Sequence, residues 1–478
     1  MAERLASRTL RNSVLVVGAR AVAKLAVFVV VALLLRYLAP EQYGRFAAMV
    51  VYVTLVGVIA DLGMQTVFIR DVSRDRDLFK RYLGTLISAR LLLSLGALLV
   101  LALVLRILSP ALLPYTVAGF VLLLTTSYSS LLRAIFYIRG RLGYEAVAIV
   151  IEALIVLALT IVAIHGRAGW DAFLWCYSAS YLFTSLFAVG VLFGRWRERV
   201  APRFEMTLLR GLLIAGVPLA LGFTITSIYA QVDVVLLQLF KGFQLVGWYS
   251  AANRYIDAVA WIPQSAMGAV FPALSMVAAA RQPQLAFAYQ KSYKMLAVLG
   301  VPLAVGIGVL AFPLIRLLAP SGHFDAAVPA LQLLAPSVLL LFVNNAFIYT
   351  LTAINRQLDF TRLTVATLIV NLVLNLALIP PFSVLGAASA STLTELALFL
   401  GGWWLLQRQA LQLAPVTSIG RVLISGGLMG VAVYSLKGLP LIALVVIGAA
   451  LYSVALIGGR ALTGEEWSIL RSGLSGRP

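Results

Sequence analysis

The stretch VLVVGARAVAKLAVFVVVALLLR, residues 14–36, decides the class of fold. It is an apolar run long enough to cross the hydrocarbon core of a bilayer as a helix, which takes about 20 residues. Two cations, Arg20 and Lys24, lie inside this run, one helical turn apart. The run is too long and too charged for a cleavable signal peptide, so we expect it to be the first permanent transmembrane helix.

Apolar stretches of this kind recur along the whole chain of 478 residues, which is 62% hydrophobic and only 12% charged. Soluble domains contain about 25% charged residues and under half apolar residues. We therefore predict an all-α polytopic membrane protein and exclude a soluble enzyme, a disordered scaffold and a secreted disulfide-rich domain. The fourteen spans that we expect are 14–36, 45–69, 83–105, 113–136, 146–164, 172–193, 209–240, 247–277, 293–315, 327–352, 362–379, 386–406, 419–436 and 440–458.

Lys and Arg residues concentrate in alternate connections between these spans, for example within residues 70–81 and 195–203. Positive charge is retained on the cytoplasmic side of a membrane protein. The pattern therefore predicts a multi-pass protein of the cytoplasmic (inner) membrane with both termini in the cytoplasm. It also explains the net charge of +19 better than binding to nucleic acid does.

The chain resembles itself across its middle. Residues 43–48 (YGRFAA) match 246–251 (VGWYSA), and residues 149–159 (IVIEALIVLAL) match 368–378 (LIVNLVLNLAL). The two matches lie in order, at equivalent places of two halves with six spans each, and an even number of spans gives parallel halves. We predict an N-terminal six-helix lobe (1–207), a C-terminal six-helix lobe (208–410) and, in 411–478, two additional helices with a short cytoplasmic tail.

Charged residues inside the spans are the best candidates for function, because each costs about 2.5–3.5 kcal/mol at the centre of a membrane helix. The cations are Arg20, Lys24, Arg90 and Arg254. The acids, which we expect to serve ion coupling or structural pairing, are Asp61, Glu152, Asp233, Asp257 and Glu395.

The depths of these residues suggest roles for some of them. Arg20 and Lys24 would repel each other unless a carboxylate or phosphate lies between them. Arg90 and Glu152 form a second plausible set in the cytoplasmic half. Glu395 lies near the middle of the membrane with no obvious partner, which makes it a candidate proton carrier. The alternative for all of them is that structural ion pairs hold the helices together.

Other signals point away from catalysis and cofactors. No nucleotide-binding or serine-nucleophile motif occurs in the sequence, so we expect neither an enzyme nor ATP-driven transport. His165 and His323 lie in turns without a ligand set around them, so we expect no metal site. Cys176 is the only cysteine, which excludes an intramolecular disulfide.

Four stretches resemble polysaccharide-export flippases of the Wzx type, whose superfamily also contains multidrug and toxin extrusion antiporters and MurJ-type lipid II flippases. The stretches are YLAPEQYGRFAA (37–48), ADLGMQTVFIRD (60–71), VDVVLLQLFKGFQLVGWYSAANRY (232–255) and NLVLNLALIP (371–380). The resemblance implies two six-helix lobes around a central cavity that opens alternately to either side.

The resemblance also implies a substrate, a polyprenyl-pyrophosphate-linked oligosaccharide repeat unit used in lipopolysaccharide or exopolysaccharide biosynthesis. The four intramembrane cations would bind its pyrophosphate, and protons or sodium ions would drive the transport. Membrane lipid, a polysaccharide polymerase and glycosyltransferases are the partners it implies. Candidate contacts to the sugar are Gln231, Asn253, Gln264, Asn344 and Asn345.

Three alternatives stay open. A multidrug or cation antiporter would use the same fold but would favour a carboxylate-rich cavity, whereas four of the nine intramembrane charges here are basic. A lipid II flippase would share both fold and chemistry. A membrane-embedded polymerase or ligase would be expected to carry a sizeable outer loop, and the predicted outer connections are short.

Overall fold

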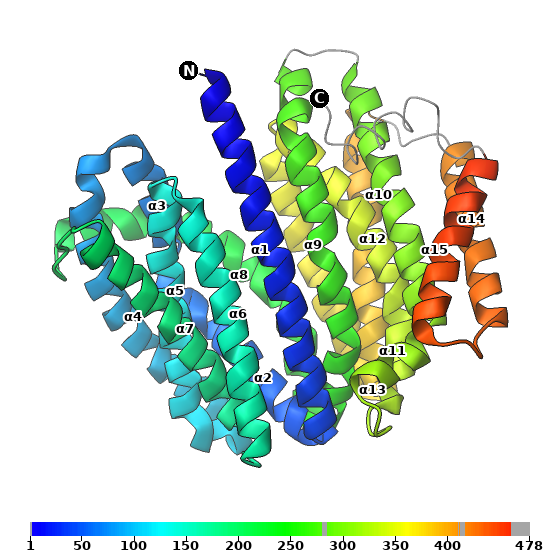
Figure 1. Cartoon of the computed structure of the whole chain (residues 1–478), viewed down its shortest axis with the longest axis horizontal. Coiled ribbons are helices and arrows are strands. Elements are labelled where there is room, and N and C mark those ends of the chain that lie inside the picture. Colours follow the sequence, from blue (N-terminus) through cyan, green and yellow to red (C-terminus); the bar gives the residue numbers. More distant parts are fainter. Residues whose placement is uncertain (1, 280–283, 410, 412–415, 460–478) are drawn as a thin grey trace. The chain divides into compact units, whose positions relative to one another are not determined.

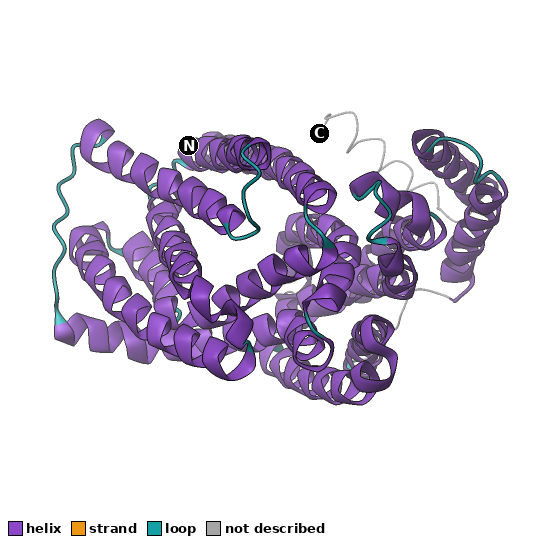
Figure 2. Cartoon of the chain, turned by 90° about the horizontal axis from the view of Figure 1, so that it is seen from below, coloured by secondary structure: helices purple, strands orange, loops and turns teal. Residues whose placement is uncertain are grey.

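The computed structural model describes residues 2–279, 284–409, 411 and 416–459. The regular elements in these ranges are all helices, and the described part contains no strand (Figures 1 and 2). The predicted cytoplasmic tail, as far as it comprises residues 460–478, lies outside the described residues.

The helices follow one another with short connections. Those of the first half are α1 (Ala2–Tyr37), α2 (Pro40–Asp61), α3 (Met64–Arg74), α4 (Phe79–Leu108), α5 (Thr116–Ile138), α6 (Leu142–His165), α7 (Ala172–Gly190) and α8 (Met206–Lys241). Those of the second half are α9 (Phe243–Ala279), α10 (Gln284–Val309), α11 (Ala311–Leu318), α12 (Val328–Ala353), α13 (Gln357–Gln407), α14 (Val416–Ser435) and α15 (Leu441–Gly458).

Most of these helices can cross a membrane. Within the described residues, 12 helices are long and apolar enough to do so, and the apolar part of α14, Ile419–Ser435, is slightly shorter. The element α13 has 51 residues, and a straight helix of that length would extend about 75 Å, far more than one crossing of the roughly 30 Å hydrocarbon core. It therefore supplies two spans, which confirms the predicted all-α polytopic membrane fold.

The two arms of α13 meet at a sharp turn. Ser383 has φ 54° and follows Pro380 and Pro381, which cannot continue a regular helix. A Cβ atom at Gly386 would lie 2.1 Å from the carbonyl oxygen of Leu378, so only glycine fits there. Beyond the turn, the Asn371 amide donates to the Thr394 hydroxyl at 3.1 Å, which shows that the two arms lie side by side.

The chain forms two compact units, Met1–Gly247 and Trp248–Pro478. In the first unit, α1 packs on α6, α5 packs on α7, and α2 packs on both α4 and α8 (Figure 1). In the second unit, α12 packs on α10 and α13, while α14 packs on α10 and α15. The predicted lobes 1–207, 208–410 and 411–478 were defined by counting spans rather than by packing, and their boundaries stay predictions.

Two glycines that the internal repeat pairs with each other allow a close backbone contact. Gly44 lies in the second turn of α2, and Gly247 lies in the second turn of α9. A Cβ atom at Gly44 would lie 1.8 Å from the carbonyl oxygen of Phe243, and one at Gly247 would lie 2.0 Å from that of Pro40. The beginnings of these two helices can approach only because neither glycine has a side chain.

We predict that Gly44→Ala destabilises the protein by about 1–3 kcal/mol, because the new methyl group must displace backbone rather than a flexible side chain. The measurement is the thermal unfolding midpoint of the purified protein in detergent. Gly57→Ala in the same helix is the matched control, since nothing lies within 4 Å of its Cβ position. Equal midpoints for the two variants would contradict the close contact.

Candidate functional site

The end of α2 positions one of the predicted acids. Helix α2 stops at Asp61 because Leu62 (φ 46°) and Gly63 (φ 74°) both adopt left-handed backbone conformations, and α3 starts at Met64. The break turns the chain against α8, where a Cβ atom at Gly63 would lie 2.3 Å from the carbonyl oxygen of Gly216. Asp61 thus lies at a helix end inside the first unit, with its side chain 29% exposed.

Arg90 of α4 is the partner of Asp61. Its side chain is 1% exposed, and its guanidinium donates to the Asp61 carboxylate and, at 2.9 Å, to the amide oxygen of Gln65. It also donates to the carbonyl oxygen of Ser127 and, at 2.9 Å, to its hydroxyl. The predicted pairing of Arg90 with Glu152 is therefore wrong. The break after α2 places Asp61 beside Arg90, and Glu152 lies near Arg133 instead.

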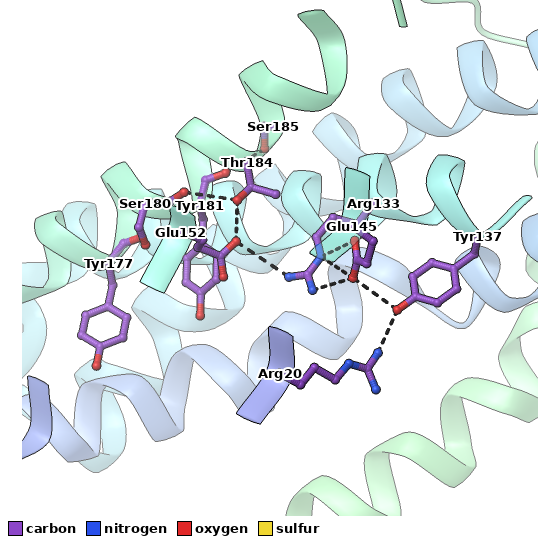
Figure 3. Close-up of polar contacts among 10 residues, drawn as sticks. All are labelled: Arg20, Arg133, Tyr137, Glu145, Glu152, Tyr177, Ser180, Tyr181, Thr184 and Ser185. Atoms are coloured by element: carbon purple, nitrogen blue, oxygen red, sulfur yellow. Dashed lines mark hydrogen bonds and ion pairs between the residues drawn. The ribbon is translucent and has the colours of Figure 1, made fainter. Parts of the chain in front are cut away.

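A second charged cluster joins α5, α6 and α7 (Figure 3). Arg133 of α5 donates to the Glu145 carboxylate at 2.7 Å and lies 3.7 Å from Glu152, two turns further along α6. The Thr184 hydroxyl of α7 donates to Glu152 at 2.5 Å. Glu145 is 1% exposed and Glu152 is 16% exposed. One arginine therefore faces two largely buried carboxylates.

Tyr137 links this cluster to α1. Its hydroxyl accepts from the Arg20 guanidinium at 2.8 Å and donates to Glu145 at 3.2 Å (Figure 3). Arg20 and Lys24, one helical turn apart on α1, are both exposed, and neither forms an ion pair with an acid among the described residues. Arg90, by contrast, is paired with the carboxylate of Asp61.

Four members of this cluster are not among the residues predicted from the sequence: Arg133, Tyr137, Glu145 and Thr184. Arg133 and Glu145 lie close to the predicted span ends, where charged residues are common, and were therefore not regarded as intramembrane. One signal could have found Glu145: it lies seven residues before Glu152, and two helical turns place both carboxylates on the same face of α6.

The remaining predicted residues lie in other places. Arg254 contacts Asp257 within α9 at 3.3 Å. The Asp233 carboxylate of α8, 8% exposed, accepts from the backbone of Val234. Glu395, expected to have no obvious partner, accepts from the amide of Asn344 at 2.7 Å.

The structure also describes two of the predicted sugar contacts and the residues that could bind a metal ion. Asn344 and Asn345 are only 2% and 7% exposed, so their surroundings are those of helix-packing residues. Within the described residues, no three His, Cys, Asp or Glu side chains form a group that could hold a metal ion. Cys176 is buried.

Models of known protein families match long stretches of the chain. A family model described as "Polysaccharide biosynthesis protein" matches residues 9–278, which is more than half of the chain. The chain belongs to this family. A second model, MatE, matches residues 218–377. The predicted resemblance to polysaccharide-export proteins is confirmed.

Individual relatives of this chain are distant from it in sequence. "Probable flippase AglR" of Haloferax volcanii is 25% identical over 48% of this chain and 50% of its own length. "Succinoglycan biosynthesis transport protein ExoT" of Rhizobium meliloti is 27% identical over 67% of this chain and 64% of its own length. "Putative O-antigen transporter" of Escherichia coli K12 is 20% identical over 55% and 63%, respectively. The chain spans less than two thirds of the length of each of these relatives.

Solved structures show a likeness in fold. "Lipid II flippase MurJ, inward closed conformation" superposes with a TM-score of 0.76 over 94% of this chain and 99% of that chain, at 14% identity. An inward-facing multidrug resistance MATE family transporter gives a TM-score of 0.63 over 81% and 95%, at 16% identity. At these identities the likeness concerns the fold alone.

We predict that Asp61→Asn lowers the stability of this family member by about 3 kcal/mol, because it leaves the Arg90 charge buried without its counter-ion. The measurement is thermal unfolding in detergent. Arg90→Met added to Asp61→Asn should restore part of the loss, since it removes the orphaned charge.

The matched control is Glu41→Gln, which breaks the exposed Arg45–Glu41 pair at 2.7 Å and should cost under about 1 kcal/mol. Additive losses in the double variant would contradict the ion pair.

Proposed function

We propose that this protein is a flippase that moves a polyprenyl-pyrophosphate-linked oligosaccharide repeat unit from the cytoplasmic to the outer leaflet, for cell-surface polysaccharide biosynthesis. Its family, the names of its relatives and its fold all favour transport over catalysis. The observation that carries the proposal is the pair Arg20 and Lys24, two exposed cations in a membrane-spanning helix that have no acidic partner among the described residues.

The pair has a physical reason to bind phosphate. Two cations one turn apart in an apolar helix repel each other, and an anion between them removes that repulsion. A pyrophosphate offers several charged oxygens, and charge-assisted hydrogen bonds to them are about twice as strong as neutral ones. The Tyr137 hydroxyl, held by Glu145, orients the guanidinium of Arg20 without neutralising it.

The four predicted cations thus receive different roles. Arg20 and Lys24 bind the pyrophosphate and replace the water around it while the protein alternates between inward-open and outward-open states. Arg90 holds α2, α3, α4 and α5 together, because both of its terminal nitrogens already donate to Asp61, Gln65 or Ser127. Arg254 belongs to the other compact unit, and its part in binding the substrate stays a prediction.

The positive-inside pattern supports a cytoplasmic-membrane location with both termini in the cytoplasm. With this orientation, Arg20 and Lys24 are reached from the leaflet in which the substrate is assembled. The proposed pyrophosphate site does not depend on which sugar is carried, because the pyrophosphate and the polyprenyl chain are common to substrates of this class.

Glu152 is the carboxylate that we propose as the site of the coupling ion, a proton or sodium ion. Arg133 cannot neutralise Glu145 and Glu152 together, and it makes its closer contacts with Glu145. Glu152, which faces Arg133, Glu145, Thr184 and Tyr181 in the packed first unit, is the carboxylate whose charge is less compensated. A bound cation balances this charge at low cost.

We predict that Arg20→Ala combined with Lys24→Ala abolishes transport while membrane insertion and the unfolding midpoint stay near those of the wild type. The variant loses both ligands of the pyrophosphate, and neither side chain is part of a buried ion pair. The measurements are complementation of a flippase-null strain and translocation of a fluorescent lipid-linked oligosaccharide in proteoliposomes.

Two controls sharpen this experiment. Arg20→Lys with Lys24→Arg keeps both charges and should keep transport. Arg106→Ala removes an exposed cation from the far end of α4 and should also leave transport intact. Full activity of the double alanine variant would disprove the pyrophosphate site.

A multidrug antiporter is the second candidate, because the MatE family model matches residues 218–377. Ethidium efflux measured on the same proteoliposomes separates the two. The flippase requires translocation of the lipid-linked oligosaccharide without ethidium efflux, and the reverse result would establish the antiporter.

A fourth prediction concerns Glu152. Glu152→Gln should remove the dependence of transport on a proton or sodium gradient with little change in stability, because Arg133 keeps its closer partner. Glu145→Gln is the matched variant; it takes a 1% exposed carboxylate from Arg133 and should lower the unfolding midpoint instead. If Glu152→Gln retains gradient-dependent transport, the coupling ion binds elsewhere.

A further inference from the structure

One pocket of the first unit lies outside both charged clusters described above. It has a volume of about 330 Å³ and lies where the chain enters α4 and leaves α5. The residues around it are Val72, Arg76, Asp77, Phe79, Lys80, Ile138, Arg139 and Glu198. Five of these eight are charged, so the pocket suits a polar group rather than a hydrocarbon chain.

The cations of this pocket are not equivalent. Arg139 pairs with Glu198, and its guanidinium lies 4.8 Å from the ring centroid of Phe79 and 5.4 Å from that of Trp196. Arg76 and Lys80 are exposed, and neither has an acidic partner in the described part of the chain. The pocket therefore has two cations available to an anion, beside one cation that is fixed as part of its wall.

The pocket lies at the level of the lipid headgroups. The membrane-crossing stretches Arg76–Leu108, Pro110–Ile138 and Ala172–Arg195 all have one end in or next to it. The polar groups of a phospholipid lie just beyond the ends of apolar helices of this kind. A group bound here can therefore remain attached to a lipid whose acyl chains stay in the bilayer.

The connection between α7 and α8 fits the same surroundings. Phe193, Phe204 and Met206 are 44%, 53% and 63% exposed, and Arg195, Arg197, Arg199 and Arg203 lie among them in the sequence. Large apolar side chains mixed with Arg are typical of segments that lie in the membrane interface beside anionic lipids. A site for a soluble anion would not require exposed apolar residues beside it.

We propose that this pocket binds the headgroup of an anionic phospholipid, with the phosphodiester held by Arg76 and Lys80. The Asp77 carboxylate, also at the pocket, accepts hydrogen bonds from headgroup hydroxyls, which makes phosphatidylglycerol the best-fitting probe. The site is separate from the Arg20–Lys24 pair and does not rest on the proposed flippase activity.

The test uses the full chain in detergent and counts bound lipid by native mass spectrometry during titration with phosphatidylglycerol. We expect Arg76→Gln combined with Lys80→Gln to weaken binding about thirtyfold, since each cation near an anionic lipid contributes roughly fivefold. Arg76→Lys with Lys80→Arg should keep the affinity.

Arg74→Gln with Arg141→Gln is the matched control, because it removes two exposed cations nearby that do not line the pocket. It should change the affinity little. Equal weakening in the two glutamine variants would overturn the proposal in favour of diffuse surface attraction. Displacement of the lipid by millimolar inorganic phosphate, or equal affinity for phosphatidylethanolamine, would overturn it as well. A normal thermal unfolding midpoint shows that each variant is folded.

Discussion

Pairing of charges within the hydrocarbon layer is the interaction on which the first unit depends. An unpaired charge at the centre of a membrane helix costs about 2.5–3.5 kcal/mol on insertion scales, and the hydrophobic effect gives helices inside a bilayer little reason to associate. Arg90 with Asp61 joins α4 to the end of α2, and Arg133 with Glu145 and Glu152 joins α5 to α6. These two arginines each link neighbouring helices, and glycines such as Gly63 allow a close backbone approach.

For the proposed flippase, this division between paired and unpaired charges also separates the structural cations from those proposed to bind substrate. A guanidinium whose two terminal nitrogens are bonded to a carboxylate, an amide and a carbonyl has little left to offer a ligand, and Arg90 is in that state. Within the described part of the chain, Arg20 is held only by the neutral hydroxyl of Tyr137, and Lys24 is exposed beside it. A position inside the membrane therefore does not by itself indicate that a cation binds substrate. The residues that contact the cation must be considered as well.

The sequence was sufficient for the fold class, because spans of about 20 apolar residues leave few alternatives. It even indicated that 362–379 and 386–406 are separate spans, through the prolines that precede the turn at Ser383. The pairing of charges could not be predicted in the same way. Depth along a helix says how far a residue lies from the surface, but not which way its side chain points. For that reason Arg90 was matched with Glu152, and Arg133 and Glu145, near span ends, were overlooked.

The second cluster has a consequence for the proposed transport. Arg20 and Glu152 are not in contact, yet Tyr137, Glu145 and Arg133 connect them by hydrogen bonds and ion pairs. A phosphate at Arg20 offsets the positive charge that this residue holds near Glu145, so the cluster becomes more negative and its affinity for a cation at Glu152 rises.

Linkage requires the reverse to hold equally: a cation at Glu152 strengthens binding of the anionic headgroup. Electrostatics within one state thus favours joint occupation of the two sites. If substrate is exchanged against an ion, the two ligands therefore do not compete for one charge. The exchange must instead arise because the conformational states differ in the side of the membrane to which each site is open.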